Sequence, residues 1–433
     1  MIKTNDDLVA MWRDIEKSGS MNSYVNQQMK AQGFTVKRSA TDSMSKRELA
    51  AYKKDLKQEA AEKRKLKSNA WLAYKANHVV YLGDGIYWND NNDVDKYDLE
   101  NAEERAAENE LPVMDDAADL ANKLAISVAD LRYLTYHREA ATQIHYKRFT
   151  IPKRNGKERA IWAPMPKLKQ AQHWVLHNVL GNLYVHGASH GFIRGRSIYS
   201  NALAHVDAKL VVKMDMQDFF PTISQPRVKG LFRKAGYRER IATLLSLLCT
   251  ESPREVVEQN GKTYYIAMGP RCLPQGAPTS PAITNALCLR LDRRLMGMAE
   301  KYGWRYTRYA DDMTFSFPDN SKKKAELSTL LFLAKKIVTD EGFTVHPEKT
   351  KITRKGRRQQ ITGLVVNGKD LPRVPRERKR EIRAAIHNLQ KGKPLREGES
   401  LESLQGYAAF VCMTDPELGH KLLAQLQAFQ TVK

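Results

Sequence analysis

The chain is poor in cysteine and has no long apolar run. Its 433 residues include only four cysteines, and none of them forms the CxxC pair that is typical of zinc sites and redox motifs. We therefore expect no disulfide framework and no zinc site, but core thiols in a reducing cytoplasm. No stretch of 18 or more apolar residues occurs, so no transmembrane helix is expected. The N-terminal segment MIKTNDDLVAMW also lacks the pattern of a signal peptide.

Acidic residues are outnumbered. The chain has 71 Lys and Arg against 49 Asp and Glu, a formal charge of +22. This excess favours a polyanionic partner such as nucleic acid, although a soluble protein with a solvated basic surface would show the same balance. Hydrophobic residues make up 42% of the chain, which is enough for a core. The length predicts two or three structural units.

The first 120 residues differ in composition from the rest. Ser45 to Lys67 is rich in strong helix formers and predicts a charged helix. A patch rich in Gly and Asn follows at residues 83–92, and residues 93–116 are strongly acidic. We interpret residues 1–120 as a mostly helical extension, which either docks a partner or is solvated and carries no site.

From about residue 121 the patterns of strands and helices alternate. Two Asn-Gly pairs, at Asn155 and Asn260, each join two strand-like segments and predict β-hairpins, the first of them with a type I′ turn. A short buried strand is predicted over residues 210–214, and a further pair of strands over residues 305–317. Helices are predicted over residues 164–183, 280–295, 325–340, 373–389, 401–413 and 416–429. Antiparallel hairpins mixed with helices predict an α+β fold and not a parallel doubly wound sheet.

Three carboxylates stand at positions where strands end. Asp215 ends an apolar strand, where a charge is costly without a reason. Asp311 and Asp312 are placed at the turn between two apolar strands, where adjacent acids repel each other unless a cation lies between them. Mg²⁺ prefers such oxygen ligands and leaves positions open for substrate phosphate. An Asp-Asp pair alone would favour a solvated β-turn, so the motifs around it decide.

Three motifs resemble those of reverse transcriptases. YADD, at residues 309–312, is similar to the YxDD box of that family, and Asp215 in MDMQDFF matches its first catalytic Asp. LPQGAPTSP, at residues 273–281, is similar to the segment that contacts the incoming nucleotide and the template. The resemblance implies a right-hand polymerase, with fingers and palm interleaved over residues 121–366 and a helical thumb over residues 367–433. It also implies RNA-directed DNA synthesis from dNTPs with two Mg²⁺ ions.

Further signatures resemble the reverse transcriptases of bacterial retrons. NALAH, at residues 201–205, matches the NAxxH signature of that group, and ITG, at residues 361–363, is similar to its VTG signature. HGFIRGRSI and HPEKT also look retron-like. The resemblance covers about residue 126 onward and leaves out the first hundred or so residues. It implies a cognate structured non-coding RNA as template and priming from a guanosine 2′-OH. The expected product is a branched RNA–DNA hybrid (msDNA), and an effector protein and anti-phage defence are expected with it.

The resemblance assigns roles to individual residues. The metal ligands would be Asp215, Asp311 and Asp312, and Lys349 would protonate the leaving pyrophosphate unless it is only a solvated charge. Phe220 matches the steric gate against a ribose 2′-OH, the alternative being a core residue. The expected nucleotide-binding residues are Lys157, Arg159, Phe220, Gln275 and Gly276, and glycine at 276 permits close backbone approach.

Other residues are candidates for contacts with nucleic acid. Tyr309 is expected to support the primer end. Arg194 and Arg196 either hold template phosphate or are surface charges. Asn201 and His205, four residues apart on a helix, either bind RNA or pack internally. A basic helix is expected to grip the duplex backbone by charge, through Arg376, Arg378 and Arg380.

Two alternatives stay open. One is another bacterial reverse transcriptase, from a group II intron or an abortive-infection system, and the retron signatures argue against it. The other is a nucleic-acid-binding scaffold without catalysis, which does not explain why all three carboxylates are present. A nuclease with paired Asp residues would leave LPQGAPTSP without a role.

Overall fold

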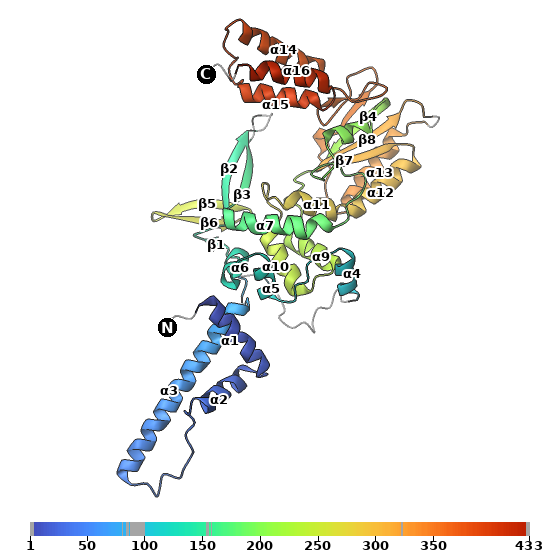
Figure 1. The fold of residues 1–433 in the computed structure, drawn as a ribbon. Helices are drawn as coiled ribbons and strands as arrows, with labels where there is room; N and C mark the ends of the chain where they lie inside the picture. The colour runs from blue at the N-terminus through green and yellow to red at the C-terminus, as the bar shows by residue number, and fades with distance from the viewer. Residues whose placement is uncertain are drawn as a thin grey trace. The chain divides into compact units, whose positions relative to one another are not determined.

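The chain divides into two compact units in the computed structural model (Figure 1). Unit 1 comprises Met1–Val179 and Gln225–Arg271, and unit 2 comprises Leu180–Ser224 and Cys272–Lys433. The predicted domain boundaries near residues 120 and 366 fall inside these units and stay predictions. The structure describes residues 4–79, 81–83, 86, 100–152, 156, 158–321 and 324–429.

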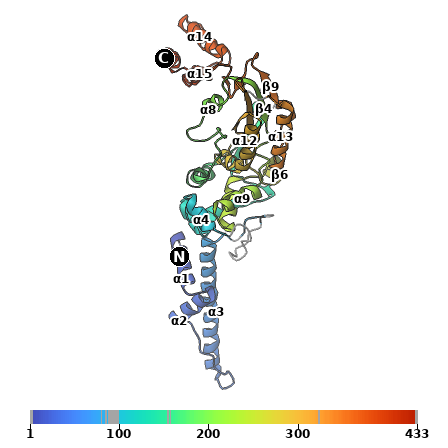
Figure 2. The same ribbon diagram turned by 90° about the vertical axis from the view of Figure 1, so that its right-hand side faces the viewer.

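Unit 1 begins with three helices that have their own small core. They are α1 (Asn5–Lys17), α2 (Met21–Ala31) and α3 (Lys46–Asn77). The helix α3 runs as one long rod, with α1 and α2 packed along it (Figure 2). It starts at a capping box, in which the Ser45 hydroxyl accepts a hydrogen bond from the Glu48 backbone N–H. The charged helix predicted over residues 45–67 is thus confirmed, and it continues to Asn77.

The rest of unit 1 surrounds a buried helix. The helix α10 (Glu239–Cys249) is buried at every position from Ile241 to Cys249. Four helices pack against it, namely α5 (Ala117–Lys123), α6 (Val128–Thr135), α7 (Pro166–Asn178) and α9 (Gln225–Ala235). The short helix α4 (Ala102–Glu108) packs on α9. Residues 1–120 are therefore mostly helical where they are described, as the sequence predicted.

Two antiparallel sheets complete unit 1. The hairpin of β2 (Tyr146–Pro152) and β3 (Glu158–Pro164) is confirmed, although Asn155 of its predicted turn lies outside the described residues. The second sheet has the order β1-β6-β5, from β1 (Ala140–Ala141), β5 (Arg254–Gln259) and β6 (Lys262–Ala267). The hairpin predicted at Asn260 is confirmed, and the φ angles of Asn260 and Gly261, 51° and 69°, are typical of a type I′ turn.

Unit 2 is built on a four-stranded antiparallel sheet of order β7-β8-β4-β9. The strands are β4 (Ala208–Asp215), β7 (Arg305–Tyr309), β8 (Asp312–Pro318) and β9 (Lys351–Arg354). The helices of this part are α8 (Ile198–Leu203), α11 (Ser280–Leu287), α12 (Leu289–Lys301) and α13 (Leu327–Asp340). A small hairpin of β10 (Gln360–Ile361) and β11 (Leu364–Val365) follows β9. Helices and antiparallel strands together confirm the α+β class.

Three helices form the C-terminal part of unit 2. They are α14 (Arg376–Gln390), α15 (Leu401–Cys412) and α16 (Pro416–Gln427), close to the predicted ranges. Their buried residues, among them Ile382 and Leu404, share one apolar core with Val211 of β4. None of the described helices has the length and apolar composition that crossing a bilayer requires.

Candidate active site

The three acidic residues meet at one end of the sheet of unit 2. Asp215 is the last residue of β4 and pairs directly with Asp312, the first residue of β8. Asp311 lies in the two-residue turn between β7 and β8, and its carbonyl accepts a hydrogen bond from Met216 N at 3.1 Å. The antiparallel register therefore gathers carboxylates that lie far apart in the sequence.

This cluster carries more negative than positive charge. Burial, followed by the negative charge of Asp215, raises the pKa of Asp311 to about 6. Burial also raises the pKa of Asp312, against the opposing charge of Lys213. Lys349 Nζ lies 2.7 Å from Asp215 Oδ1 and is half-exposed. An added cation would relieve the repulsion that remains between the carboxylates.

The donor set suits a hard cation that shares its coordination sphere with substrate. Within the described ranges, no three side chains of the His, Cys, Asp or Glu type are gathered so as to hold a metal ion by themselves. Mg²⁺ seldom occupies an all-protein cage and is usually held by one or two carboxylates together with water and substrate phosphates. Partly buried carboxylates with raised pKa values fit that kind of site.

The acidic turn is fixed by a fully buried ion pair. Arg308 Nε and Nη2 donate to the two carboxylate oxygens of Asp292 at 2.8 and 2.7 Å, and both side chains are 0% exposed. Arg308 Nη1 donates to the carbonyl of Ala310 at 3.1 Å, directly before Asp311. Because breaking a buried ion pair leaves an uncompensated charge, this pair holds the turn in place.

A loop of unit 2 approaches the same turn very closely. A Cβ added to Gly191, in the HGFIRGRSI segment, would lie 2.9 Å from Ala310 N, closer than real contacts allow. Asn285 Nδ2 donates to Gly191 O at 2.8 Å, and its Oδ1 accepts from Arg308 at 3.1 Å. The sequence analysis assigned no role to Asn285, Asp292 or Arg308. Asp292 and Arg308 stand among other charged residues of their segments, so no local signal marked them.

The LPQGAPTSP segment lies beside the turn that carries Phe220. Leu273 N donates to Ile223 O at 3.1 Å, which joins this segment to the turn after β4. The Phe220 ring is half-buried, with its centroid 5.7 Å from that of Phe219. Gln275 is half-buried, and the exposed Gly276 has a φ of 122°, which favours glycine. The structure thus brings three nucleotide-site candidates into neighbouring segments.

The two basic candidates of the β2–β3 hairpin cannot be placed in this way. Lys157 lies outside the described residues, and only the backbone of Arg159 is described, paired with Ile151. Their proposed contact with the triphosphate stays a prediction.

The basic residues of the loop before α8 differ from each other. Arg194 is exposed and has no recorded partner within the described part of the chain. Arg196 donates to the backbone carbonyls of His186, Gly187 and Ser189, so it braces its own loop.

The half-buried Tyr309 has its ring centroid 6.1 Å from that of Phe192.

Asn201 and His205 are buried inside unit 2. They are 1% and 0% exposed. The two ring nitrogens of His205 lie 2.7 Å from the hydroxyl oxygens of Ser316 and Thr307. Thr307 in turn donates to Asn201 Oδ1 at 2.6 Å. Of the two interpretations left open by the sequence, this geometry favours internal packing, because neither side chain offers surface to an RNA.

The three arginines of α14 also differ in their exposure and contacts. Arg376 and Arg380 are exposed. Arg378 pairs with Glu381 at 2.9 Å, and its guanidinium lies 4.2 Å from the centre of the Tyr407 ring. Arg378 therefore also packs α14 against α15.

Known proteins with similar sequences agree with these features. The reverse transcriptase (RNA-dependent DNA polymerase) family profile matches residues 151–381. The reverse transcriptase of retron Mx162 from Myxococcus xanthus is 50% identical over 437 residues, which cover 99% of this chain and 90% of the relative. That of retron Mx65 from the same organism is 41% identical, over 72% of this chain and 71% of the relative. Among solved structures, telomerase from Candida albicans is 13% identical with a TM-score of 0.39, over 91% of this chain and 69% of that one.

The similarity to the Mx162 enzyme reaches further than the motifs did. Because it covers nearly the whole chain, it includes the N-terminal extension, which the motif resemblance left out. Both relatives come from retrons, which supports the retron interpretation over the intron and abortive-infection alternatives. The chain therefore belongs to the retron reverse transcriptases, which are RNA-directed DNA polymerases with a right-hand polymerase fold.

Proposed function

We propose that this enzyme copies part of a cognate structured non-coding RNA into DNA by two-metal nucleotidyl transfer at the acidic end of the β7-β8-β4-β9 sheet. The observation that carries the proposal is the pairing of Asp215 with Asp312 beside Asp311. Three converging carboxylates repel one another unless a cation lies between them, and the substrate of a polymerase brings Mg²⁺ and phosphate together.

The residues of the cluster would divide metal binding and proton transfer between them. Asp215, Asp311 and Asp312 would hold two Mg²⁺ ions, which stabilise the charge on attacking and leaving oxygens when bound. The ion pair with Asp215 holds the Lys349 ammonium beside the acidic cluster. From there it can deliver a proton to the departing pyrophosphate.

The neighbouring segments would bind the incoming nucleotide. Phe220 would exclude a ribose 2′-OH, and Gln275 and Gly276 would line the pocket for the nucleotide and the template. Lys157 and Arg159 would reach the triphosphate from the β2–β3 hairpin. Tyr309, at the end of β7, would support the primer terminus.

The RNA partner would be held mainly through its backbone. The net charge of +22 favours such a polyanion. Within α14, the exposed Arg376 and Arg380 are the better candidates for phosphate contact, since Arg378 is engaged with Glu381 and Tyr407. Arg194 is the better candidate in the loop before α8, because Arg196 is engaged with its own loop.

The retron membership supports a more specific product. DNA synthesis would start from the 2′-OH of a guanosine at a branch point in the same RNA, and would give a branched RNA–DNA hybrid (msDNA). That complex would restrain an effector protein in anti-phage defence in the cytoplasm.

The test is to purify the enzyme from cells that carry its native locus and to analyse the bound nucleic acid with RNase and DNase. The proposal expects a short DNA joined to RNA through a 2′-5′ branch, which disappears when Asp311 and Asp312 are both changed to Ala. Unbranched DNA, or RNA alone, would contradict the proposed priming. A double variant that still makes DNA would contradict the assigned site.

A further inference from the structure

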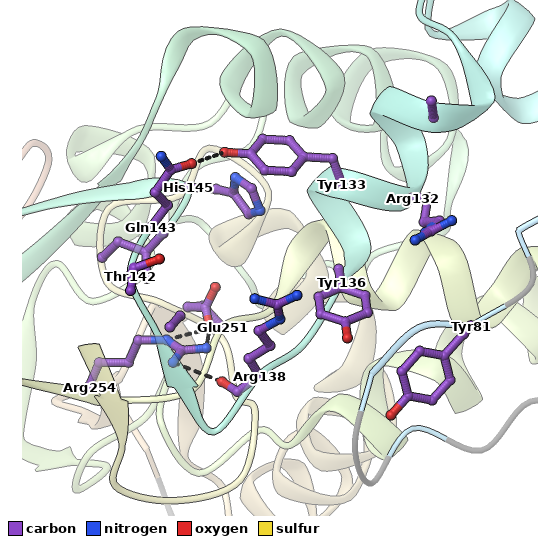
Figure 3. Close-up of a pocket in the computed structure, with 13 residues that line it drawn as sticks. Tyr81, Arg132, Tyr133, Tyr136, Arg138, Thr142, Gln143, His145, Glu251 and Arg254 are labelled. Atoms are coloured by element: carbon purple, nitrogen blue, oxygen red, sulfur yellow. Dashed lines mark hydrogen bonds and ion pairs between the residues drawn. The ribbon is translucent and has the colours of Figure 1, made fainter. Parts of the chain in front are cut away.

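A cavity in unit 1 lies apart in sequence from every residue placed at the acidic site. Its volume is about 520 Å³, within the range of ordinary ligand sites. It is lined by residues of α6, by the segment between α6 and β2, by Tyr81 and by the start of β5. In Figure 3, Tyr81 and Tyr136 lie on one side of the cavity, and Glu251 and Arg254 on the other.

The side formed by Glu251 and Arg254 is internally satisfied. Arg254, 7% exposed, donates to Glu251 Oε1 from Nε and Nη2 at 3.2 and 3.1 Å. Its Nη1 donates to the carbonyls of Arg138 and Tyr265 at 3.0 and 2.9 Å. This buried pair therefore fixes the wall of the cavity, and its charges are already matched.

The opposite side presents aromatic rings to solvent. Tyr133 is 50% exposed and Tyr81 is 48% exposed. The rings of Tyr81 and Tyr136 meet edge to face at 5.8 Å, and Tyr133 meets the ring of His145 in the same way at 4.5 Å. The half-exposed ring of Tyr133 is the kind of flat surface on which an unpaired base stacks.

Two arginines stand among these tyrosines. Arg132 and Arg138 are both exposed, and neither has an acidic partner among the residues that the structure describes. The Arg138 guanidinium lies 5.0 Å from the centre of the Tyr136 ring. Guanidinium groups bind phosphate through paired N–H donors. An aromatic ring can stack on a base, and an arginine beside it that has no acidic partner can bind the phosphate of the same nucleotide.

The remaining polar residues of the rim can read a sugar. Thr142 and Gln143 are exposed, and the Tyr133 hydroxyl donates to Gln143 Oε1 at 3.3 Å. Hydroxyl and amide groups beside a stacked base can meet a ribose 2′-OH, which distinguishes RNA from DNA.

We propose that this cavity is a second RNA-binding site, which takes one unpaired nucleotide of a single-stranded RNA segment against the ring of Tyr133, with its phosphate on Arg132 or Arg138. The proposal rests on the RNA partner proposed above, but it does not depend on catalysis at the acidic cluster.

Photo-crosslinking of the full chain tests the site directly. The probe is a short unstructured RNA that carries 4-thiouridine, irradiated with the enzyme and mapped by mass spectrometry. We expect adducts on peptides that contain Tyr81, Tyr133 or Tyr136. Tyr133→Ala should remove adducts at position 133 and weaken binding of the probe about ten-fold, the loss typical of one stacked base.

Two variants control for folding and for general charge effects. Tyr133→Phe keeps the stacking ring and should bind the probe nearly as well as the unchanged enzyme. Tyr184→Ala removes a tyrosine of unit 2 that is 67% exposed and should leave both adducts and affinity unchanged. DNA synthesis on a poly(rA) template with an oligo(dT) primer should be the same in all three variants.

Three results would overturn the proposal. One is a bound probe whose adducts all lie outside the cavity, while synthesis on poly(rA) continues normally. Another is equal loss of affinity in Tyr133→Ala and Tyr184→Ala. The third is a single-stranded DNA of the same sequence that displaces the probe from the cavity as well as RNA does, since the site would then serve DNA.

Discussion

Ala310 adopts a left-handed conformation, with a φ of 54°, directly before Asp311. A two-residue hairpin turn with positive φ at its first position normally takes glycine there, and an alanine costs about 1–3 kcal/mol. The hydrogen bond from Arg308 and the close approach of Gly191 offset that cost by fixing the turn from two sides. Strain at such a position is common in active sites.

Gly191 gives the sharpest residue-scale prediction. In Gly191→Ala, the new methyl group would meet the Ala310 backbone and displace the acidic turn. We expect kcat for primer extension on poly(rA) with oligo(dT) to fall about 10- to 100-fold, because small displacements of reacting groups are costly.

The matched control is Gly187→Ala in the same loop, where an added Cβ meets nothing within 4 Å. This variant should keep the kcat of the unchanged enzyme. Equal losses of kcat in the two variants would mean that the loop tolerates no alanine at all. The close approach of Gly191 to Ala310 would then not explain the loss.

His205 gives a prediction about pH. Burial, followed by the charges of Arg305 and His190, lowers the pKa of His205 to about 3, from about 6.5 in an unfolded chain. Below pH 6.5 the unfolded chain therefore takes up a proton that the folded chain refuses, so this residue costs stability as the pH falls toward 3. His205→Gln should flatten the fall of the urea midpoint between pH 6.5 and pH 4.

The exposed His420 provides the comparison for this pH series. His420→Gln should show the same fall of the midpoint as the unchanged enzyme. A His205→Gln variant with an equally steep fall would show that the buried ring is not what limits stability in acid.

At the scale of elements, the sequence predicted those parts whose signals are local. The Asn260-Gly261 turn requires two positive φ angles, and the dipeptide shows this directly. The helix predicted over residues 280–295 is instead two helices that meet at Cys288. Apolar periodicity continues across that point, so the break carried no sequence signal.

Elements that depend on distant partners were less visible. The four-residue strand β9 pairs with β4, which lies well over a hundred residues earlier, and was not predicted. The three carboxylates were found because their motifs are local. The ion pair of Asp292 with Arg308 joins a helix to a strand and could only be seen in the folded chain. Asn201 and His205 matched a signature, but only their burial favours packing over RNA binding.

The helix α14 carries the element-scale prediction. Changing Arg376 and Arg380 together to Ala should weaken binding of an RNA–DNA duplex and reduce the slope of log K against log salt by about two, since each lost phosphate contact removes about 0.9. A salt titration by fluorescence anisotropy measures this slope. Arg378 is left in place because it packs against Tyr407.

The control removes two other exposed charges of unit 2, Lys335 and Lys336 of α13. If both double variants change the slope equally, binding responds to net charge alone and α14 is not a specific grip.

At the scale of the whole molecule, the extension consists of parts with different attachments. The helices α1 to α3 have their own core, which includes Ile15 and Val25, and α3 also contacts α6. The helix α4 does not share that core and is tied to α9 and α10, where Arg105 Nε donates to Lys234 O at 3.1 Å and Glu103 pairs with Arg238. A clean deletion therefore ends before α4.

Deleting Met1–Asn77 should spare DNA synthesis but abolish protection against phage, if the three helices dock the effector or the DNA product. Their strongly basic α3 and their separate core motivate this expectation. Primer extension and phage plaque counts measure the two outcomes. An equal loss of both would mean that these helices support the fold of the polymerase itself.

The alternation of the chain between the two units has a consequence for its synthesis on the ribosome. The segment with β4 is made before Gln225–Arg271 completes unit 1, and before β8 exists to pair with β4. Roughly 100 residues separate the two strands, so at about 5–20 residues per second the wait lasts on the order of 5–20 s. During that interval β4 is an apolar strand with two unpaired edges, which is the state most prone to mispairing. The nascent chain therefore exposes an unpaired strand from the time Asp215 leaves the exit tunnel until β8 has been made.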